Sequence, residues 1–346
     1  AGVGHTAFTI MELIGVVVAV SAFNHPLNLS IHQVIPAVAT GCPVIIKPAS
    51  VTPLCALRLA NLIKEAGLPE GWVQVALTNR ENSEKLVTDP RVGFFSFIGS
   101  AKVGWYLKSK LAPGTRCALE HGGVAPLIFD KYADEQGFIN GVVKASMYHS
   151  GQVCVSVQRV YVPKDRATEM AQKIANIASK QVVGDAINED SDLGPLILPK
   201  ETDRIEAWVD EAIQEGATLI TGGKRINEVS YEPTVLLNPA KGSKVSTQEV
   251  FGPIVCIYGY QIINDAIEQA NSLDVSFQSA IFSDDVSLAM GVAKKLEASA
   301  VMINDYTTFR VDWMPFAGRK HSGYGIGGIG YSMRDMLEHK MIVTKG

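Results

Sequence analysis

A single cysteine and a single glutamate stand in segments where each could do covalent or acid–base chemistry. Cys154 ends the segment Ser150-Gly-Gln-Val-Cys154, and a cysteine thiolate is a strong nucleophile. A lone cysteine among apolar neighbours is also commonly a small core residue. Glu120 lies in Leu119-Glu-His-Gly-Gly123, where it could act as a base or mark the turn that follows a strand. Taken alone, each residue leaves both interpretations open.

Two further polar residues come directly after apolar segments. Asn24 lies in Phe23-Asn-His-Pro26, after one apolar run and before a helical pattern, and Lys47 follows the next apolar run in Ile46-Lys-Pro-Ala-Ser50. Enzymes with parallel sheets place ligand contacts at such strand ends. Asn and Pro also favour turns, so turn formation is the alternative for both segments.

These segments, with others, resemble motifs of the aldehyde dehydrogenase superfamily. They occur in the family's order and close to its spacings across essentially the whole chain. Seven ordered motifs are far more specific than any one of them. They are Phe23-Asn-His-Pro26, Lys47-Pro-Ala-Ser50, Phe97-Ile-Gly-Ser100, Leu119-Glu-His-Gly-Gly123, Gly151-Gln-Val-Cys154, Glu249-Val-Phe-Gly-Pro253, and Pro315-Phe-Ala-Gly318 with His321-Ser-Gly323.

The resemblance implies an NAD(P)-dependent oxidation of an aldehyde to a carboxylic acid. Cys154 would attack the aldehyde carbon to give a thiohemiacetal and then a thioester. The Asn24 amide and the Cys154 backbone N–H would hold the oxyanion, and one such donor contributes about 3 kcal/mol in comparable sites. Glu120 would activate the water that hydrolyses the thioester.

The same resemblance implies a set of cofactor contacts. Lys47 would bind the adenosine ribose, and Gly99-Ser100 would open a helix whose N-terminus meets the pyrophosphate. Glu249 would bind the nicotinamide ribose, with Phe251 packed nearby. Ser50 is neutral where a carboxylate would repel a 2′-phosphate, so the sequence permits NAD or NADP.

A substrate contact is predicted near the end of the chain. Arg310 comes shortly before Phe316, in the motif that resembles the family's substrate-tunnel border. Arg310 could bind an anionic group on a short aldehyde, or it could form a structural ion pair with Asp312. The stretch Phe309-Arg-Val-Asp-Trp-Met-Pro315 resembles members that act on lactaldehyde, phosphonoacetaldehyde or semialdehydes.

The elements that must position these residues alternate between short apolar strands and amphipathic helices. Such alternation predicts an α/β fold with a doubly wound parallel sheet. The expected strands are 15–20, 43–47, 73–77, 94–98, 127–129 and 217–221, and the expected helices are 27–39, 54–66, 165–180, 203–215, 263–271 and 286–297.

The resemblance divides this α/β chain into parts. A Rossmann-like coenzyme-binding domain is expected at 14–122 and an α/β catalytic domain at 123–322. Small oligomerisation strands are expected at 1–13 and within 323–346, and they imply a homo-oligomer, a dimer or a tetramer. Family members carry roughly a quarter more chain at the N-terminus, so a truncated product is expected.

Composition narrows the remaining function classes. With 346 residues and a net charge of −4, the chain suits two domains and shows no charge run for nucleic acid or a membrane surface. Its five cysteines are scattered, which favours a reducing, cytoplasmic location. The histidines lack ligand spacing, so no metal is expected. The Gly323–Gly328 segment matches GxGxxG but is interpreted as a flexible turn, without the strand and helix of a nucleotide loop.

Two alternative functions stay open. A cofactor-independent cysteine esterase could use Cys154 and Glu120, and turnover without NAD(P) would distinguish it. A non-catalytic descendant would keep the fold and reduce no nicotinamide with any aldehyde. Acyl transfer to coenzyme A is disfavoured, because Glu120 is retained as a base for hydrolysis.

Overall fold

The computed structural model describes residues 2–346, which form two compact units. The first unit comprises residues 2–120, 311–317 and 323–346, and the second comprises 121–310 and 318–322. The chain therefore leaves the first unit after Glu120 and returns to it near its end. Along the part of the chain described, no helix is long and apolar enough to cross a membrane.

The first unit is built on a six-stranded sheet in the order β18-β6-β5-β2-β3-β4. Neighbouring strands are parallel, except that β18 runs antiparallel to β6. Its strands are β2 (Val16–Val20), β3 (Val44–Lys47), β4 (Val73–Val75), β5 (Val92–Ile98), β6 (Arg116–Glu120) and β18 (Gly323–Tyr324). Because β3 and β5 flank β2, the strand order reverses at β2, and ligands bind outside the carboxyl ends of strands at such a switch point.

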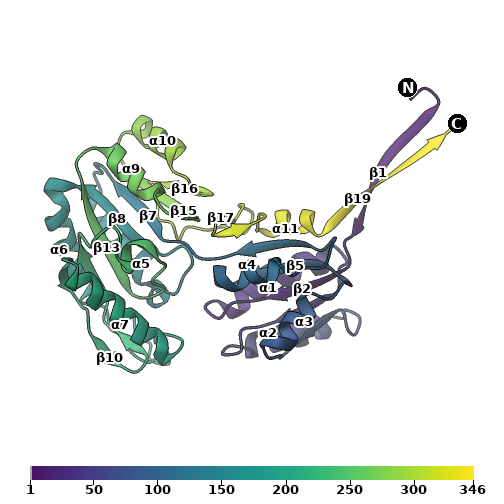
Figure 1. The fold of residues 1–346 in the computed structure, drawn as a ribbon, viewed down its shortest axis with the longest axis horizontal. Coiled ribbons are helices and arrows are strands. Elements are labelled where there is room, and N and C mark those ends of the chain that lie inside the picture. The colour runs from purple at the N-terminus through teal and green to yellow at the C-terminus, as the bar shows by residue number, and fades with distance from the viewer. Residues whose placement is uncertain (1) are drawn as a thin grey trace. The chain divides into compact units, whose positions relative to one another are not determined.

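Helices cover both faces of this sheet (Figure 1). Val17 packs in one hydrophobic cluster with α1 and α2 residues, whereas Val18 packs in a second cluster with Leu107 of α4. Successive strand residues point to opposite faces, so the two clusters are the two sides of one sheet. The helices are α1 (Pro26–Ala39), α2 (Leu54–Glu65), α3 (Arg80–Val87), α4 (Ala101–Lys108) and α11 (Ile329–Asp335).

The second unit holds a seven-stranded sheet in the order β16-β15-β7-β8-β13-β12-β9, parallel except for β12 with β9. Its strands are β7 (Ala125–Phe129), β8 (Val157–Pro163), β9 (Thr218–Thr221), β12 (Thr234–Leu237), β13 (Ile254–Tyr260), β15 (Gln278–Phe282) and β16 (Ala300–Ile303). Four short strands form two small sheets, β10 (Arg225–Asn227) with β11 (Ser230–Tyr231) and β14 (Val275–Ser276) with β17 (Arg319–Lys320).

Helices enclose the central strands of the second unit, which are buried along nearly their whole length. Continuous burial fits the mainly apolar sequences of these strands, and the buried polar residues Gln158 and Arg159 of β8 donate hydrogen bonds to backbone carbonyls. The helices are α5 (Glu135–Met147), η1 (Tyr148–Gly151), η2 (Lys164–Arg166), α6 (Ala167–Ala178), α7 (Pro199–Gln214), α8 (Lys244–Thr247), α9 (Ile263–Asn271) and α10 (Val286–Lys295).

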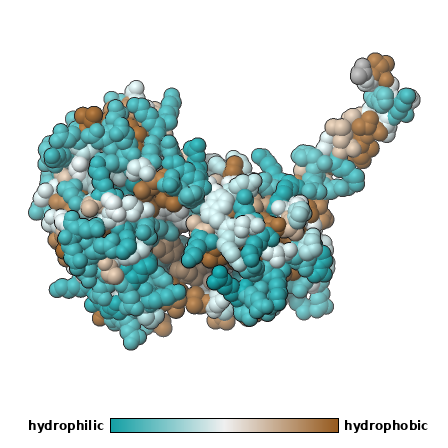
Figure 2. All heavy atoms as spheres, in the orientation of Figure 1, coloured by the Kyte–Doolittle hydropathy of each residue, from teal (hydrophilic) through white to brown (hydrophobic). Residues whose placement is uncertain are grey.

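A two-stranded antiparallel ribbon joins the ends of the described chain. Strand β1 (His5–Leu13) pairs with β19 (Leu337–Lys345) along its full length. Every residue of β1 is exposed, and the ribbon carries hydrophobic side chains, seen as brown atoms in Figure 2. Phe8, Met341 and Val343 are 50%, 67% and 55% exposed.

The predicted α/β class is confirmed, and several element boundaries need correction; β4 ends at Val75 rather than at 77, and α10 ends at Lys295 rather than at 297. The interpretation of Gly323–Gly328 as a flexible turn is wrong, because Gly323 and Tyr324 form β18 and α11 begins at Ile329. Strand β18 is antiparallel, which is not the context of a dinucleotide loop. The helix expected at 203–215 begins earlier, at Pro199, because proline suits the first turn of a helix.

Candidate active site

Asn24 lies at the switch point of the first sheet. It follows β2 and precedes α1, and it is 8% exposed. Its side-chain nitrogen Nδ2 lies 3.3 Å from Nδ1 of His25, the residue that precedes α1. The proline at the start of α1 has no N–H to leave unsatisfied, so the Phe23–Pro26 turn ends the strand and begins the helix in a few residues.

Lys47 and Ser50 come together after the adjacent strand. Lys47 is the last residue of β3, and its Nζ lies 3.5 Å from the hydroxyl oxygen of Ser50. Burial lowers the pKa of the Lys47 amine, because a charged ammonium loses hydration there. The sequence-predicted pair is therefore one local cluster, with a half-buried amine and an exposed hydroxyl.

Gly99 and Ser100 connect β5 to α4. Ser100 occupies the position before α4, and its side chain makes no capping hydrogen bond within residues 2–346. A methyl group on Gly99 would lie 2.9 Å from the Phe97 ring, so only glycine fits without a shift. The predicted helix start is confirmed, and its backbone N–H groups form a site suited to an anion.

Glu120 ends β6, between two neighbouring strands. It pairs in register with Ile98 of β5 and with Gly323 of β18, and its carbonyl accepts a 3.0 Å hydrogen bond from Gly99 N–H. A methyl group on Gly327 would lie 3.2 Å from Glu120 Oε2. The glycine-rich segment of the C-terminal part thus lies against this carboxylate.

Cys154 lies in a loop between η1 and β8. The three residues His149, Ser150 and Gly151 have φ values of 57°, 55° and 70°, a left-handed run that non-glycine residues rarely adopt. Outliers of this kind persist where the surroundings impose them. Cys154 itself is half-buried.

Side chains that the sequence did not single out hold this loop. Ser150 Oγ donates a 2.5 Å hydrogen bond to the Gly194 carbonyl, and Gln152 accepts one of 3.0 Å from Ile197 N–H. Thr307, which is fully buried, donates 2.5 Å to the Val155 carbonyl. No residue spacing could have indicated these partners, because they are distant in the sequence.

Glu249 stands in the second unit with an unusual environment. Burial raises the pKa of its carboxyl to about 8, against a hydrogen bond from the Gly123 N–H and the nearby Arg204 charge. Its Oε1 is buried and, among the described residues, has no hydrogen-bond partner. Phe251, two residues later, has a φ of 49°. An enclosed carboxylate with one free acceptor is suited to a ligand hydroxyl.

The predicted substrate residues have different settings. Phe316 is 3% exposed, and its backbone exchanges hydrogen bonds of 3.0 and 2.8 Å with Gly327. Arg310 is half-buried. Asp312, considered above as a structural partner of Arg310, lies 3.4 Å from His32 Nε2.

The sequence-predicted residues divide between the two units. Within the first, Asn24, Lys47, Gly99 and Glu120 all stand at carboxyl ends of strands in the same sheet. The first unit contains Asn24, Lys47, Ser50, Gly99, Ser100, Glu120 and Phe316, and the second contains Cys154, Glu249, Phe251 and Arg310. Across residues 2–346, no group of three or more His, Cys, Asp or Glu is arranged to hold a metal.

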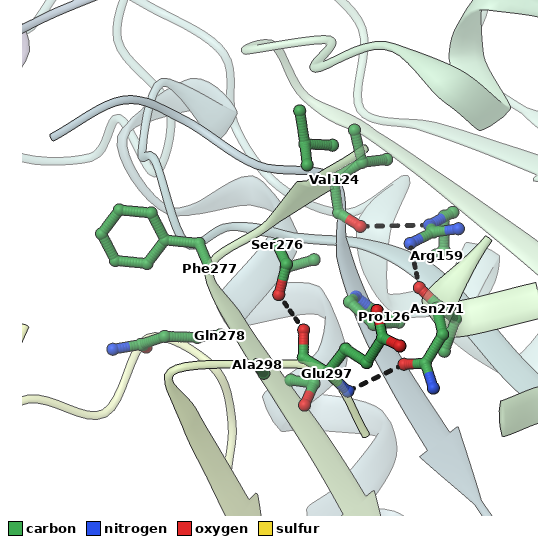
Figure 3. Close-up of a pocket in the computed structure, with 13 residues that line it drawn as sticks. Val124, Pro126, Arg159, Asn271, Ser276, Phe277, Gln278, Glu297 and Ala298 are labelled. Atoms are coloured by element: carbon green, nitrogen blue, oxygen red, sulfur yellow. Dashed lines mark hydrogen bonds between the residues drawn. The ribbon is translucent and has the colours of Figure 1, made fainter. Parts of the chain in front are cut away.

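A small cavity in the second unit has a structural explanation (Figure 3). Its volume of about 10 Å³ is room for one water molecule. Buried Arg159 lines it and donates hydrogen bonds to the carbonyls of Val124, Gln269 and Ala270. None of the candidate residues above is among the described residues that line it. The guanidinium caps the end of α9 there.

Comparison with known proteins decides the family. The aldehyde dehydrogenase family model matches residues 2–342. This chain belongs to the aldehyde dehydrogenase family. The predicted family and its α/β fold are therefore confirmed, and the enzyme oxidises an aldehyde with NAD or NADP as cofactor.

Among curated relatives, this aldehyde dehydrogenase is 41% identical over 338 residues to a 3-sulfolactaldehyde dehydrogenase of Priestia aryabhattai, covering 97% of this chain and 70% of the relative. It is 38% identical over 341 residues to a lactaldehyde dehydrogenase of Methanococcus vannielii, covering 97% and 73%. A solved structure, glyceraldehyde-3-phosphate dehydrogenase of Methanocaldococcus jannaschii complexed with NADP, superposes with a TM-score of 0.94 at 36% identity, covering 99% of this chain and 75% of that one.

The residues present fit a dinucleotide cofactor in three respects. The α4 N-terminus can receive a pyrophosphate, and the Lys47 and Ser50 pair offers donors for a ribose. Glu249 Oε1 is a buried acceptor without a partner among residues 2–346, as a carboxylate that receives ribose hydroxyls requires.

Proposed function

We propose that this aldehyde dehydrogenase oxidises a short aldehyde that carries an anionic group. The observation that carries the proposal is the similarity to enzymes named for 3-sulfolactaldehyde and glyceraldehyde 3-phosphate, whose substrates bear a sulfonate and a phosphate. Arg310 supplies a half-buried guanidinium, the group best suited to bind such anions. Lactaldehyde, the substrate named for another relative, is the neutral competitor.

In the proposed reaction Cys154 is the nucleophile. Its thiolate forms a bond to the aldehyde carbon, and the carbonyl electron pair moves to oxygen, where the Asn24 amide and the Cys154 N–H donate hydrogen bonds. When bound, the nicotinamide supplies the acceptor for hydride from this carbon, which leaves a thioester on Cys154. Glu120 takes a proton from water, the hydroxide adds to the thioester, and the acid leaves as the thiolate is restored.

The proposed cofactor residues have distinct tasks. Lys47 binds the adenosine ribose, and Ser50 leaves room for either a 2′-hydroxyl or a 2′-phosphate. Gly99-Ser100 binds the pyrophosphate through backbone N–H groups. Glu249 accepts hydrogen bonds from the nicotinamide ribose, and Phe251 packs beside it. In this assignment residues 14–122 bind coenzyme and residues 123–322 carry the catalytic thiol.

The exposed ribbon of β1 and β19 supports a homo-oligomer. A two-stranded ribbon is marginally stable alone, and its exposed side chains include Phe8, Met341 and Val343. We assign it as the dimerisation element, and sedimentation of Met341→Lys and Val343→Lys variants as smaller species than the parent protein would support this. A cytoplasmic location stays a prediction from the scattered cysteines.

An aldehyde panel with NAD and NADP tests the proposed chemistry. The panel pairs anionic with neutral aldehydes of equal length, and reduction of the nicotinamide is followed by absorbance. We expect Cys154→Ser to lose at least about 1000-fold in turnover, because a neutral serine hydroxyl is a far weaker nucleophile than a thiolate. Nicotinamide reduction at the parent rate in Cys154→Ser would exclude the assigned nucleophile, and ester cleavage without any nicotinamide reduction would favour an esterase.

Substitution of Arg310 tests the substrate class. Arg310→Ala should raise KM at least about tenfold for the anionic aldehydes, since a hydrogen bond to a charged group is lost, and leave the neutral aldehydes unchanged. Arg319→Ala, which removes an exposed guanidinium that donates to the Ala298 carbonyl, is the control. Equal KM changes for anionic and neutral aldehydes would contradict the proposal.

A further inference from the structure

The carboxyl group of Glu249 rests directly on the backbone of Gly122. A methyl group added to Gly122 would overlap the carboxyl carbon and both oxygens of Glu249. Gly122 does not have the positive φ that favours glycine, so an alanine there would not strain the backbone. The Glu249 carboxyl group can therefore occupy this position only because Gly122 has no side chain.

The next residue completes this seat. Gly123 donates its N–H to the Glu249 carboxyl, and Arg204 adds a favourable charge. Arg204 is itself fixed, with a 2.7 Å hydrogen bond to the Val250 carbonyl. The Glu249 carboxyl group thus contacts Gly122 and accepts a hydrogen bond from Gly123, while its Oε1 has no partner among the residues described.

The segment that follows Glu249 also packs against the loop that contains Cys154. A methyl group on Gly151 would overlap the carbonyl group of Gly252, so the two backbones are in direct contact. Gly151 is three residues before Cys154, and Gly252 is three residues after Glu249. Two glycine contacts therefore set the Glu249 carboxylate and the Cys154 loop relative to one another within the second unit.

We propose that Gly122 is a positioning residue that fixes the Glu249 carboxylate for the cofactor ribose at a set place relative to Cys154. The proposal rests on the proposed contact of Glu249 with the nicotinamide ribose. It assigns to Gly122 a role in cofactor affinity through Glu249, without any contact of its own. A carboxylate displaced from this seat loses the Gly123 N–H and its alignment with the ribose hydroxyls.

The test is a double-mutant cycle on cofactor affinity, measured by calorimetry without aldehyde. Gly122→Ala should weaken NAD(P) binding about tenfold, because the hydrogen bonds between the Glu249 carboxyl group and the ribose are disrupted. In the Glu249→Gln background the same change should have less than about a twofold further effect, because the contact of the carboxyl group is already lost. Glu249→Asp, whose carboxyl group is one methylene shorter, should restore part of the affinity that Gly122→Ala removes.

The matched control is Gly291→Ala. Gly291 lies in α10 of the same unit, and an added methyl group there meets nothing within 4 Å. Melting temperatures of all variants separate loss of fold from loss of position, and the rate of Cys154 alkylation reports on the cysteine loop. Unchanged cofactor affinity in Gly122→Ala, with Glu249→Gln impaired, would overturn the positioning role. Unchanged affinity in Glu249→Gln would instead overturn the proposed ribose contact.

Discussion

The two proposed ribose contacts of this enzyme are built in opposite ways. Lys47 and Ser50 in the first unit form a loose pair, with 3.5 Å between Nζ and the hydroxyl oxygen and with an exposed serine. Glu249 in the second unit is wedged on the backbone of Gly122, with a buried oxygen. The first contact is open to solvent, and the second is packed against backbone.

This difference follows the chemistry proposed for each end of the cofactor. The adenosine ribose is far from the reacting carbon, so its binding site needs affinity and tolerates adjustment. The nicotinamide must meet the carbon bound to Cys154 in a defined geometry, and small misplacements there are costly for rate. The close packing of the Glu249 carboxyl group against the Gly122 backbone limits such misplacement.

The largest effect is expected from a substitution at the contact between Gly151 and Gly252. Gly151→Ala would place a methyl group into the Gly252 carbonyl, at a residue whose φ is 70°. Neither backbone can yield cheaply, so we expect a loss of about 2–4 kcal/mol in the free energy of unfolding, together with slower turnover. Urea unfolding of this variant beside Gly291→Ala measures the effect. A stability equal to that of the control would show that the two loops separate easily.

A substitution at Ser50 should alter the preference between NAD and NADP and leave the fold intact. Ser50→Glu places a carboxylate near the position proposed for the ribose 2′ substituent, where it would repel a phosphate. We expect the KM for NADP to rise about 10- to 100-fold and the KM for NAD to change little. Ser50→Gln, of equal size without charge, is the control. Parallel changes for both cofactors would place Ser50 away from the ribose.

The sequence predicts the strand-end residues well, and physical reasons explain why. Asn24, Lys47 and Gly99 each follow a short apolar run, and parallel strands place their carboxyl ends along one edge of the sheet. Alternation of strands and helices is a local signal. It therefore predicts β2, β3, β4 and β5 of the first sheet without knowledge of contacts, whereas the helix start after Ser100 is implied only by the family resemblance.

The contacts of glycines and long-range partners could not be predicted in this way. The sequence shows Gly122 and Gly151, but not that they face Glu249 and Gly252. Gln152 bonds to Ile197, 45 residues away. The Gly323–Gly328 segment was misinterpreted for the same reason, since β18 exists only through pairing with β6. The local sequence pattern does not indicate these tertiary contacts.

The smallest expected effect concerns the pH dependence of stability. In the unfolded chain the Glu249 carboxyl group has the ordinary pKa of 4.5, whereas burial raises its pKa to about 8 in the folded protein. As pH rises from 4.5 to 8, the unfolded state therefore loses its proton first, and the free energy of unfolding falls. Above about pH 8 both states are ionised, and this contribution no longer changes.

Glu249→Gln removes this titration while keeping the size of the side chain. The difference in free energy of unfolding between the variant and the parent protein should move in favour of the variant by about 1–2 kcal/mol between pH 5 and pH 8. This is less than the full change in pKa would give, because Glu249 is only half-buried and solvent screens its charge. Urea unfolding at several pH values measures it, and Glu228→Gln, at an exposed position of the same unit, serves as the control. A difference that is constant with pH would mean that the Glu249 carboxylate is well hydrated. The seat on Gly122 would then be as adaptable as the Lys47 and Ser50 pair.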